Sequence, residues 1–332
     1  MPKQLDFVAV GDITTDAFIR LKDASVHCDI NREHCLICMR FGDKIPYEFV
    51  EVVHAVGNGP NAAVSAARLG LSSAAVTNIG DDQNGQECRE SLEKDGVSTD
   101  FVTVHKGLPT NYHYVLWYEE ERTILIKHTE FEYRFPMDLP PPKWMYLTSL
   151  PLPALAYHGE VLAYLKEHPD VKLAFQPGTF QIKVGYEKLK DVYNRANIFF
   201  CNKGEAQLIL QKPQEHDAKS LLSALHALGP KIIAMTDGPK GASVFDGIDY
   251  WSIGMYPDPK PPYDRTGAGD SFASTFTAAL ALGKSIPEAL AWGPVNSMSV
   301  VQQVGAQKGL LARPALESLL AEAPENYRAT KL

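Results

Sequence analysis

Residues 264–270, Asp-Arg-Thr-Gly-Ala-Gly-Asp, are the segment whose residue types and spacing indicate chemistry most directly. They stand between a strand-like region and an apolar stretch, 271–282, that is typical of a buried helix. Glycines let backbone amides approach an anion closely, and the free N–H groups at a helix start carry partial positive charge. The segment therefore predicts a phosphate-binding loop that contains no lysine.

Asp270 closes this loop where a helix cap would stand, and capping is the simplest role for such a residue. A carboxylate beside a phosphate-binding loop repels its ligand, however, which makes it a poor choice for capping alone. Phosphoryl transfer demands mainly positioning and charge neutralisation, so a carboxylate of ordinary pKa suffices to take the proton of an attacking hydroxyl. We therefore predict that Asp270 is a catalytic base and that the amides of Gly267, Ala268, Gly269 and Asp270 form an anion hole.

The elements that must position this loop are strand-like runs alternating with helical ones. The predicted strands are 7–12, 74–80, 144–150, 172–178, 197–202 and 231–238, and the predicted helices include 61–69, 84–95, 186–194, 205–210 and 271–282. Such alternation is typical of a mostly parallel sheet with helices on both faces. Segments 18–55 and 101–130 show strand alternation without helices and predict a small separate sheet, a lid.

The composition is that of an ordinary globular chain. The 332 residues, 45% of them hydrophobic, can bury one large core, and we expect a single domain over residues 1–332. The net charge of -8 includes no basic block, so no nucleic acid or membrane partner is expected, only small molecules. The N-terminus does not resemble a signal peptide, and no window approaches the roughly 18 apolar residues of a membrane span, so a cytoplasmic location is predicted.

Five cysteines, an odd number in a long chain, favour reduced thiols over a disulfide framework. Three of them lie near two histidines, and the group His27, Cys28, His34, Cys35 and Cys38 contains enough ligands for a tetrahedral zinc. No second Cys-x-x-Cys follows at standard spacing. The interpretation favours plain thiols and leaves metal binding by this group open.

The glycine-rich loop resembles the Asp-x-Thr-Gly-Ala-Gly-Asp motif of the ribokinase-like (PfkB) carbohydrate kinase family, and the resemblance extends over nearly the whole chain. Residues 11–16, Gly-Asp-Ile-Thr-Thr-Asp, resemble the family's first strand and turn, which ends in an aspartate that binds substrate hydroxyls. Residues 56–63 resemble its second substrate segment, with Val56 where the lid hinge normally has a glycine. The resemblance implies an α/β fold: a ribokinase-like three-layer αβα sandwich with a mostly parallel central sheet and a small β-sheet lid.

Further segments resemble family motifs in the expected order. Residues 202–205 resemble an Asn-x-x-Glu motif that helps to hold magnesium and phosphate, although a helix cap would give the same pattern. Residues 236–241 resemble a nucleotide loop or form a tight turn, and residues 296–307 resemble the adenine-side helix and loop. Arg265 can add a guanidinium to a phosphate. Asp264 is a candidate for a monovalent-cation site, such as K⁺, whose existence the sequence leaves open.

The resemblance thus assigns expected roles by position. Substrate binding is expected of Asp16, Gly57, Asn58, Asn61 and Asp270. Binding of ATP is expected of Asn202, Glu205, Thr236, Gly238, Gly241, Arg265, Thr266, Gly267, Gly269 and Asn296, with Mg²⁺ held by Glu205 through water.

The predicted function is ATP-dependent phosphorylation of a hydroxyl, a primary CH₂OH, of a sugar or sugar acid. A nucleoside kinase is the alternative, because Tyr112, Tyr114 and Trp117 on the predicted lid can stack on a purine or simply pack the lid. A non-catalytic sugar- or nucleotide-binding regulator is the second alternative, although Asp270 and the glycines are all present. Gln176-Pro177-Gly178 also differs from the Asp-x-Asn common in the family.

Rival classes lack their motifs. No GxGxxG follows the first strand, as a dinucleotide-binding dehydrogenase requires, and GxxxxGK[ST] is absent. The lid strands, with their exposed edges, also predict a homodimer formed through the lid.

Overall fold

The structure, a computed structural model, describes residues 4–28, 35–119, 121–151 and 154–332. Its main sheet has eleven strands in the order β17-β16-β15-β14-β13-β12-β11-β1-β6-β7, with β8 paired to β6. The parallel strands are β1 (Phe7–Val10), β6 (Ser73–Gly80), β7 (Val97–Ser98), β8 (Val102–His105), β11 (Trp144–Leu147), β12 (Lys172–Phe175), β13 (Ile198–Asn202) and β14 (Ile232–Thr236). The antiparallel edge comprises β15 (Ala242–Phe245), β16 (Tyr250–Ile253) and β17 (Thr330–Lys331). The predicted mostly parallel sheet is confirmed.

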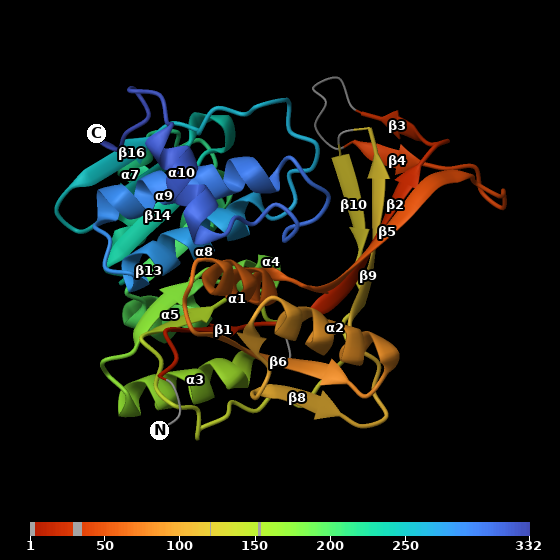
Figure 1. The fold of residues 1–332 in the computed structure, drawn as a ribbon, viewed down its shortest axis with the longest axis horizontal. Coiled ribbons are helices and arrows are strands. Elements are labelled where there is room, and N and C mark those ends of the chain that lie inside the picture. The colour runs from red at the N-terminus through yellow and green to blue at the C-terminus, as the bar shows by residue number, and fades with distance from the viewer. Residues whose placement is uncertain (1–3, 29–34, 120, 152–153) are drawn as a thin grey trace.

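Helices cover both faces of this sheet, and alternate residues of each strand point to opposite sides, so each strand contributes to the core on both faces. In β1, Phe7 and Ala9 belong to one buried cluster and Val8 and Val10 to the other. The first cluster is covered by α1 (Asn58–Arg68), α2 (Gln83–Lys94), α8 (Ala268–Ala281), α9 (Ile286–Val300) and α10 (Arg313–Ala321). The second is covered by α3 (Leu155–Glu167), α4 (Thr179–Val184), α5 (Tyr186–Arg195), α6 (Lys203–Leu210) and α7 (Ala218–His226). The three-layer αβα arrangement is therefore confirmed (Figure 1).

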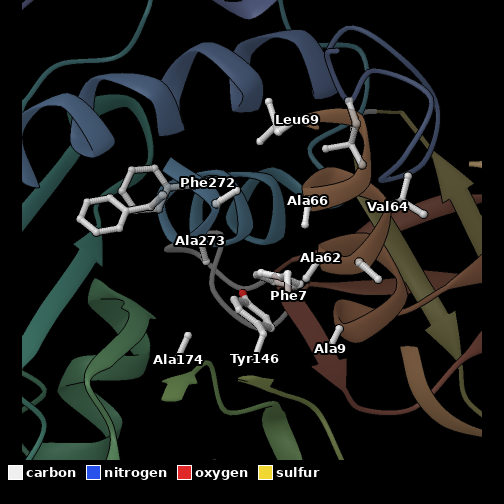
Figure 2. Packing of buried hydrophobic residues seen from close by; sticks show 14 of the residues in the cluster. Phe7, Ala9, Ala62, Val64, Ala66, Leu69, Tyr146, Ala174, Phe272 and Ala273 are labelled. Carbon is white, nitrogen blue, oxygen red and sulfur yellow. The ribbon is translucent and has the colours of Figure 1, made fainter. Parts of the chain in front are cut away.

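Small side chains bring α1 and α8 close together over the centre of the sheet. Ala62 and Ala66 of α1 and Ala273 of α8 pack in the same cluster as Tyr146 of β11, as Figure 2 shows. Helices approach most closely where their contact residues are small. The consequence is that the first turns of α1 and α8, which come from distant parts of the sequence, lie side by side.

A separate four-stranded sheet, in the order β10-β9-β2-β5, projects from the body (Figure 1). Its strands are β2 (Thr14–Leu21), β5 (Tyr47–Val56), β9 (Tyr112–Tyr118) and β10 (Glu121–Leu125), and β3 (Ser25–His27) pairs with β4 (Leu36–Cys38) at its far end. Phe18, Val115 and Trp117 pack on its inner face with Val304 of the main body. This sheet is the predicted lid, except that β8, within the predicted segment 101–130, pairs with β6 instead.

The thiol prediction was partly wrong, because Cys28 and Cys35 form a disulfide. An odd number of cysteines requires only that one be left over, and here Cys38, Cys88 and Cys201 are free. Among the described residues no group of three or more potential ligands could hold a metal ion, and His34 lies outside those residues. Within the same residues, no helix is long and apolar enough to cross a membrane.

Candidate active site

The glycine-rich loop leads directly into α8. Gly267 precedes the helix with a φ of 79°, and a Cβ there would lie 2.3 Å from the Cβ of Ala306, so only glycine fits. Gly269 differs, because a Cβ there would meet no atom within 4 Å, which leaves its backbone open to a ligand. The first N–H groups of a helix have no intrahelical partner. The loop therefore has free backbone N–H groups at the helix start, the geometry that an anion hole requires.

Asp270 lies in the first turn of α8 and is surrounded by neutral amides. Its Oδ1 accepts from Asn58 Nδ2 at 2.8 Å and its Oδ2 from Asn61 Nδ2 at 2.9 Å. Burial raises the pKa of the Asp270 carboxyl above its ordinary value, and the hydrogen bonds from the amides oppose that shift. The carboxylate is thus a better proton acceptor than the ordinary one that the sequence suggested.

Gln176 is the third amide on Asp270 and was not among the predicted site residues. Its Nε2 donates to Asp270 Oδ1 at 3.1 Å, while its Oε1 accepts from the Tyr146 hydroxyl. Because Tyr146 is a donor to Oε1, the amide is oriented with its NH₂ toward the carboxylate. The residue that departs from the family's Asp-x-Asn pattern therefore lies at the centre of the site.

A second set of polar residues lies under the lid, and we call Asp12, Asp16, His113, His128 and Tyr133 the polar cluster. His113 Nδ1 lies 3.3 Å from Asp16 Oδ1, and His128 Nδ1 lies 3.5 Å from Asp12 Oδ2. The two imidazole rings are 5.2 Å apart, and Tyr133 donates to Asp12 Oδ1 at 2.7 Å. Among the described residues, His113 Nε2 is buried without a hydrogen-bond partner. Such a group is expected to meet a polar ligand.

The parallel register of β2 and β9 creates part of this cluster, since it places Asp16 opposite His113. Of the cluster, only Asp16 was predicted as a site residue. The alternation of β9 could have revealed His113, because it shares a face with Val115 and Trp117, which point inward. Nothing in the sequence alone pairs His128 with Asp12.

The hinge before α1 joins the polar cluster to Asp270. Gly57 has a φ of 114°, and a Cβ there would lie 2.7 Å from the carbonyl oxygen of Asp12. The next residue, Asn58, is the amide that binds Asp270. Gln307 donates through Nε2 to Asn61 Oδ1 at 3.0 Å, which turns the Asn61 NH₂ toward Asp270. Two of the predicted substrate residues, Asn58 and Asn61, are thus brought together around the Asp270 carboxylate, whereas Asp16 lies in the polar cluster beside His113.

A cavity of about 480 Å³ opens on the other side of the glycine-rich loop. Predicted nucleotide residues that line it are Thr236, Gly238, Gly241, Arg265 and Gly269. Tyr256, Pro257, Pro294 and Val301 add apolar and aromatic surface, which suits the flat faces of a nucleobase. The site therefore consists of the polar cluster with the amides around Asp270 and of an apolar cavity at the start of α8.

Asn296 does not reach this cavity. It is fully buried, and its Nδ2 donates to Thr275 Oγ1 at 2.7 Å while its Oδ1 accepts from the Leu311 amide at 2.9 Å. Its neighbour Ser297 lines the cavity instead. One residue along a helix rotates a side chain by about 100°, so Asn296 packs between α8 and α9 while the side chain of Ser297 faces the cavity.

Asn202 and Glu205 cap α6 reciprocally, as the simpler interpretation of Asn-x-x-Glu requires. Asn202 Oδ1 accepts from the Glu205 amide at 2.9 Å, and Glu205 Oε2 accepts from the Asn202 amide at 2.8 Å. Burial raises the pKa of the Glu205 carboxyl, and the charge of Asp270 adds to the shift. Two carboxylates that repel each other in this way form a place where a divalent cation is favourable, so Glu205 fits a magnesium site.

Comparison with known proteins identifies the family. Residues 29–313 match the model described as the pfkB family carbohydrate kinase. The chain is 27% identical to the ribokinase of Bacillus subtilis over 80% of this chain and 87% of the relative. Its fold matches Arabidopsis thaliana ribokinase complexed with ribose and ATP, with a TM-score of 0.79 at 21% identity over 96% of this chain and 99% of that one. It also matches a Methanocaldococcus jannaschii nucleoside kinase, with a TM-score of 0.77 at 16% identity over 96% and 99% of the two chains.

The chain therefore belongs to the pfkB family of carbohydrate kinases, and it has the ribokinase fold. It is a carbohydrate kinase that acts on a small molecule.

Proposed function

We propose that the protein transfers the γ-phosphoryl group of ATP to a primary hydroxyl of a neutral sugar, with Asp270 as the base. The observation that carries this proposal is the position of Asp270. Its carboxylate binds the side-chain amides of Asn58 and Asn61, while its backbone belongs to the helix start that borders the 480 Å³ cavity. A hydroxyl held beside these amides would face a phosphate held at the helix start.

The chemistry follows from this placement. The substrate oxygen forms a bond to the γ-phosphorus, the bond from phosphorus to the leaving ADP oxygen breaks, and the hydroxyl proton passes to Asp270. The N–H groups of Gly269 and Asp270 stabilise the charge of the transferring group. Asn58 and Asn61 hold the carboxylate so that one of its lone pairs can face the hydroxyl.

Magnesium, when bound, neutralises phosphate charge, and Glu205 is the residue that would hold it through water. Glu205 Oε2 is engaged by the helix cap, which leaves Oε1 for a water ligand. The residue thus combines the two roles that the sequence offered as alternatives.

The charges of the polar cluster favour an uncharged substrate over a sugar acid. The imidazoles of His128 and His113 lie beside Asp12 and Asp16, and in the part of the chain that the structure describes neither aspartate pairs with a lysine or arginine. Together with Asp270 they would repel a carboxylate and accept hydrogen bonds from hydroxyls.

The aromatic residues give less support to a nucleoside substrate. Trp117 is buried against Arg20, Arg122 and Tyr263, so its ring is already covered. Tyr114 lies on the opposite, outer face of β9 and is exposed. Packing of the lid is the role that these contacts support.

The outer face of the lid supports the proposed homodimer. Val50, Val52, Tyr114 and Leu125 are exposed there, and strand pairing places them on one side of the sheet. A contiguous apolar sheet face of this kind is typical of an interface. We expect a dimer by light scattering and a monomer for Val52→Lys; a monomeric native protein would contradict the dimer.

The function is tested by measuring ADP release from magnesium-ATP with a panel of neutral pentoses and hexoses, sugar acids and nucleosides. We expect turnover with a neutral sugar and its loss in Asp270→Asn. Turnover only with a sugar acid or a nucleoside would overturn the substrate proposal. ATP binding without turnover of any compound would instead support the non-catalytic regulator.

A further inference from the structure

An arginine from the lid reaches the first residue of the glycine-rich loop. Arg122 Nη2, from β10, lies 2.8 Å from Oδ1 of Asp264, and the two side chains are only 10% and 0% exposed. Burial of both partners matters, because a surface pair would contribute little, whereas removing one partner of a buried pair leaves an uncompensated charge.

Asp264 is also bonded to the backbone on both sides of the loop. Its Oδ1 accepts from the Thr266 amide at 2.6 Å and its Oδ2 from the Gly305 amide at 2.8 Å. Gly305 stands beside Ala306, the residue that fixes Gly267. The carboxylate therefore holds together the two segments that shape the anion hole.

This arrangement does not fit a monovalent cation on Asp264. The guanidinium already supplies the positive charge at Oδ1, and a cation on the same oxygen would face it at short range. The two backbone amides donate to the carboxylate and occupy further positions around it. The sequence left this site open, and the contacts of Asp264 argue against it.

Neighbouring contacts fix Arg122 in place. Its Cζ lies 5.0 Å from the ring centroid of Trp117, and the Trp117 ring packs edge-on against Tyr263 at 5.0 Å. Tyr263 immediately precedes Asp264, so the lid contacts two consecutive residues at the start of the glycine-rich loop. Docking of the lid and the geometry of the loop are thereby linked.

We propose that Arg122 is a positioning residue that supplies, from the lid, the positive charge that Asp264 requires, so that the anion hole forms without any monovalent cation. The proposal rests on the proposed kinase function for its activity measurements. Its second consequence, cation-independent nucleotide binding, does not depend on the identity of the sugar.

The first test compares the native protein in buffers with tetramethylammonium, sodium or potassium as the added cation. We expect kcat/KM and the Kd for ATP to agree within about twofold across the three buffers, since the charge is built into the chain. A potassium activation of tenfold or more would overturn the proposal. If no sugar turns over, the proposed function fails, and the Kd for ATP still tests Arg122.

The second test removes the guanidinium with Arg122→Met. We expect kcat/KM to fall about 100-fold in tetramethylammonium buffer, because a displaced anion hole costs that much. Added guanidinium or potassium should restore about tenfold or more, since either can approach the freed carboxylate. The Kd for ATP should weaken and recover in parallel.

The matched control is Arg20→Met. Arg20 lies 4.6 Å from the same Trp117 ring but pairs with Glu48 and the Glu119 carbonyl rather than with Asp264. We expect Arg20→Met to keep its activity and to show no response to guanidinium.

Loss of activity in a folded Arg122→Met protein that no cation restores would overturn the proposal. If that variant does not fold, Arg122→Gln, which keeps a polar side chain but removes the charge, replaces it, and strong activation of this variant by guanidinium but not of the native protein supports the proposal, whereas no activation overturns it.

Discussion

Two aspartates six positions apart in one loop have opposite environments. Asp264 forms an ion pair with a guanidinium and accepts hydrogen bonds from two backbone amides. Asp270 meets only neutral side-chain amides, and burial raises the pKa of its carboxyl. A carboxylate balanced by a fixed positive charge serves as a stable anchor, whereas one surrounded by neutral donors can accept a proton and release it. The same residue type thus takes two roles because of its neighbours.

Replacing each aspartate by asparagine should separate the two roles most strongly. Asp270→Asn should lower kcat by about 10³-fold, since a positioned base contributes on that order, while the free energy of unfolding falls by no more than about 1 kcal/mol. Asp264→Asn should lower the free energy of unfolding by about 3 kcal/mol, because Arg122 stays buried and unpaired. Steady-state kinetics and urea unfolding of both variants measure these effects. An equal loss of stability in the two variants would contradict the assignment of different roles to the two aspartates.

The pH dependence of activity should sharpen the contrast. The base acts when deprotonated, so kcat/KM should rise with pH through the raised pKa of Asp270. The amide of Gln176 stabilises the charged form and lowers this pKa. Gln176→Met removes that donor, so the acidic limb should move to higher pH. A pH profile of kcat/KM measures this, and a limb that stays in place or moves to lower pH would contradict the assignment of the base.

A third aspartate, Asp16, is paired with a histidine, which predicts an effect on the sugar alone. His113→Ala should raise the KM for the sugar about tenfold, as expected for one lost hydrogen bond with a buried partner, and leave the KM for ATP unchanged. Steady-state kinetics with each substrate varied will measure both constants. A change of similar size in the KM for ATP would contradict a role of His113 in sugar binding alone.

The smallest effect on activity is expected at Asn296. Asn296→Ala should cost about 2 kcal/mol in the free energy of unfolding, since it leaves the buried Leu311 amide without its acceptor, and should leave the Kd for ATP unchanged. Calorimetry of unfolding and of ATP binding provides the two values. Weaker ATP binding by this variant, with an unchanged free energy of unfolding, would instead support a role of Asn296 in nucleotide binding.

Much of the fold could be predicted from the sequence, because the signals are local. Apolar strands alternating with helices predicted the sheet, and the glycines before α8 predicted a helix start open to an anion. Asp270 followed from its position in that loop. These properties depend on residues that are neighbours in the chain, so no knowledge of distant contacts was needed.

The remaining features depend on contacts between segments that are far apart in the sequence. Gln176, His113 and His128 join the site, and Arg122 reaches Asp264, only because strands of the lid and sheet pack around the starts of α1 and α8. The sequence also could not tell that Asn296 faces α8 while Ser297 faces the cavity, or that Cys28 pairs with Cys35. Local propensity determines which elements form, whereas close packing decides which side chains meet and therefore which charges are balanced.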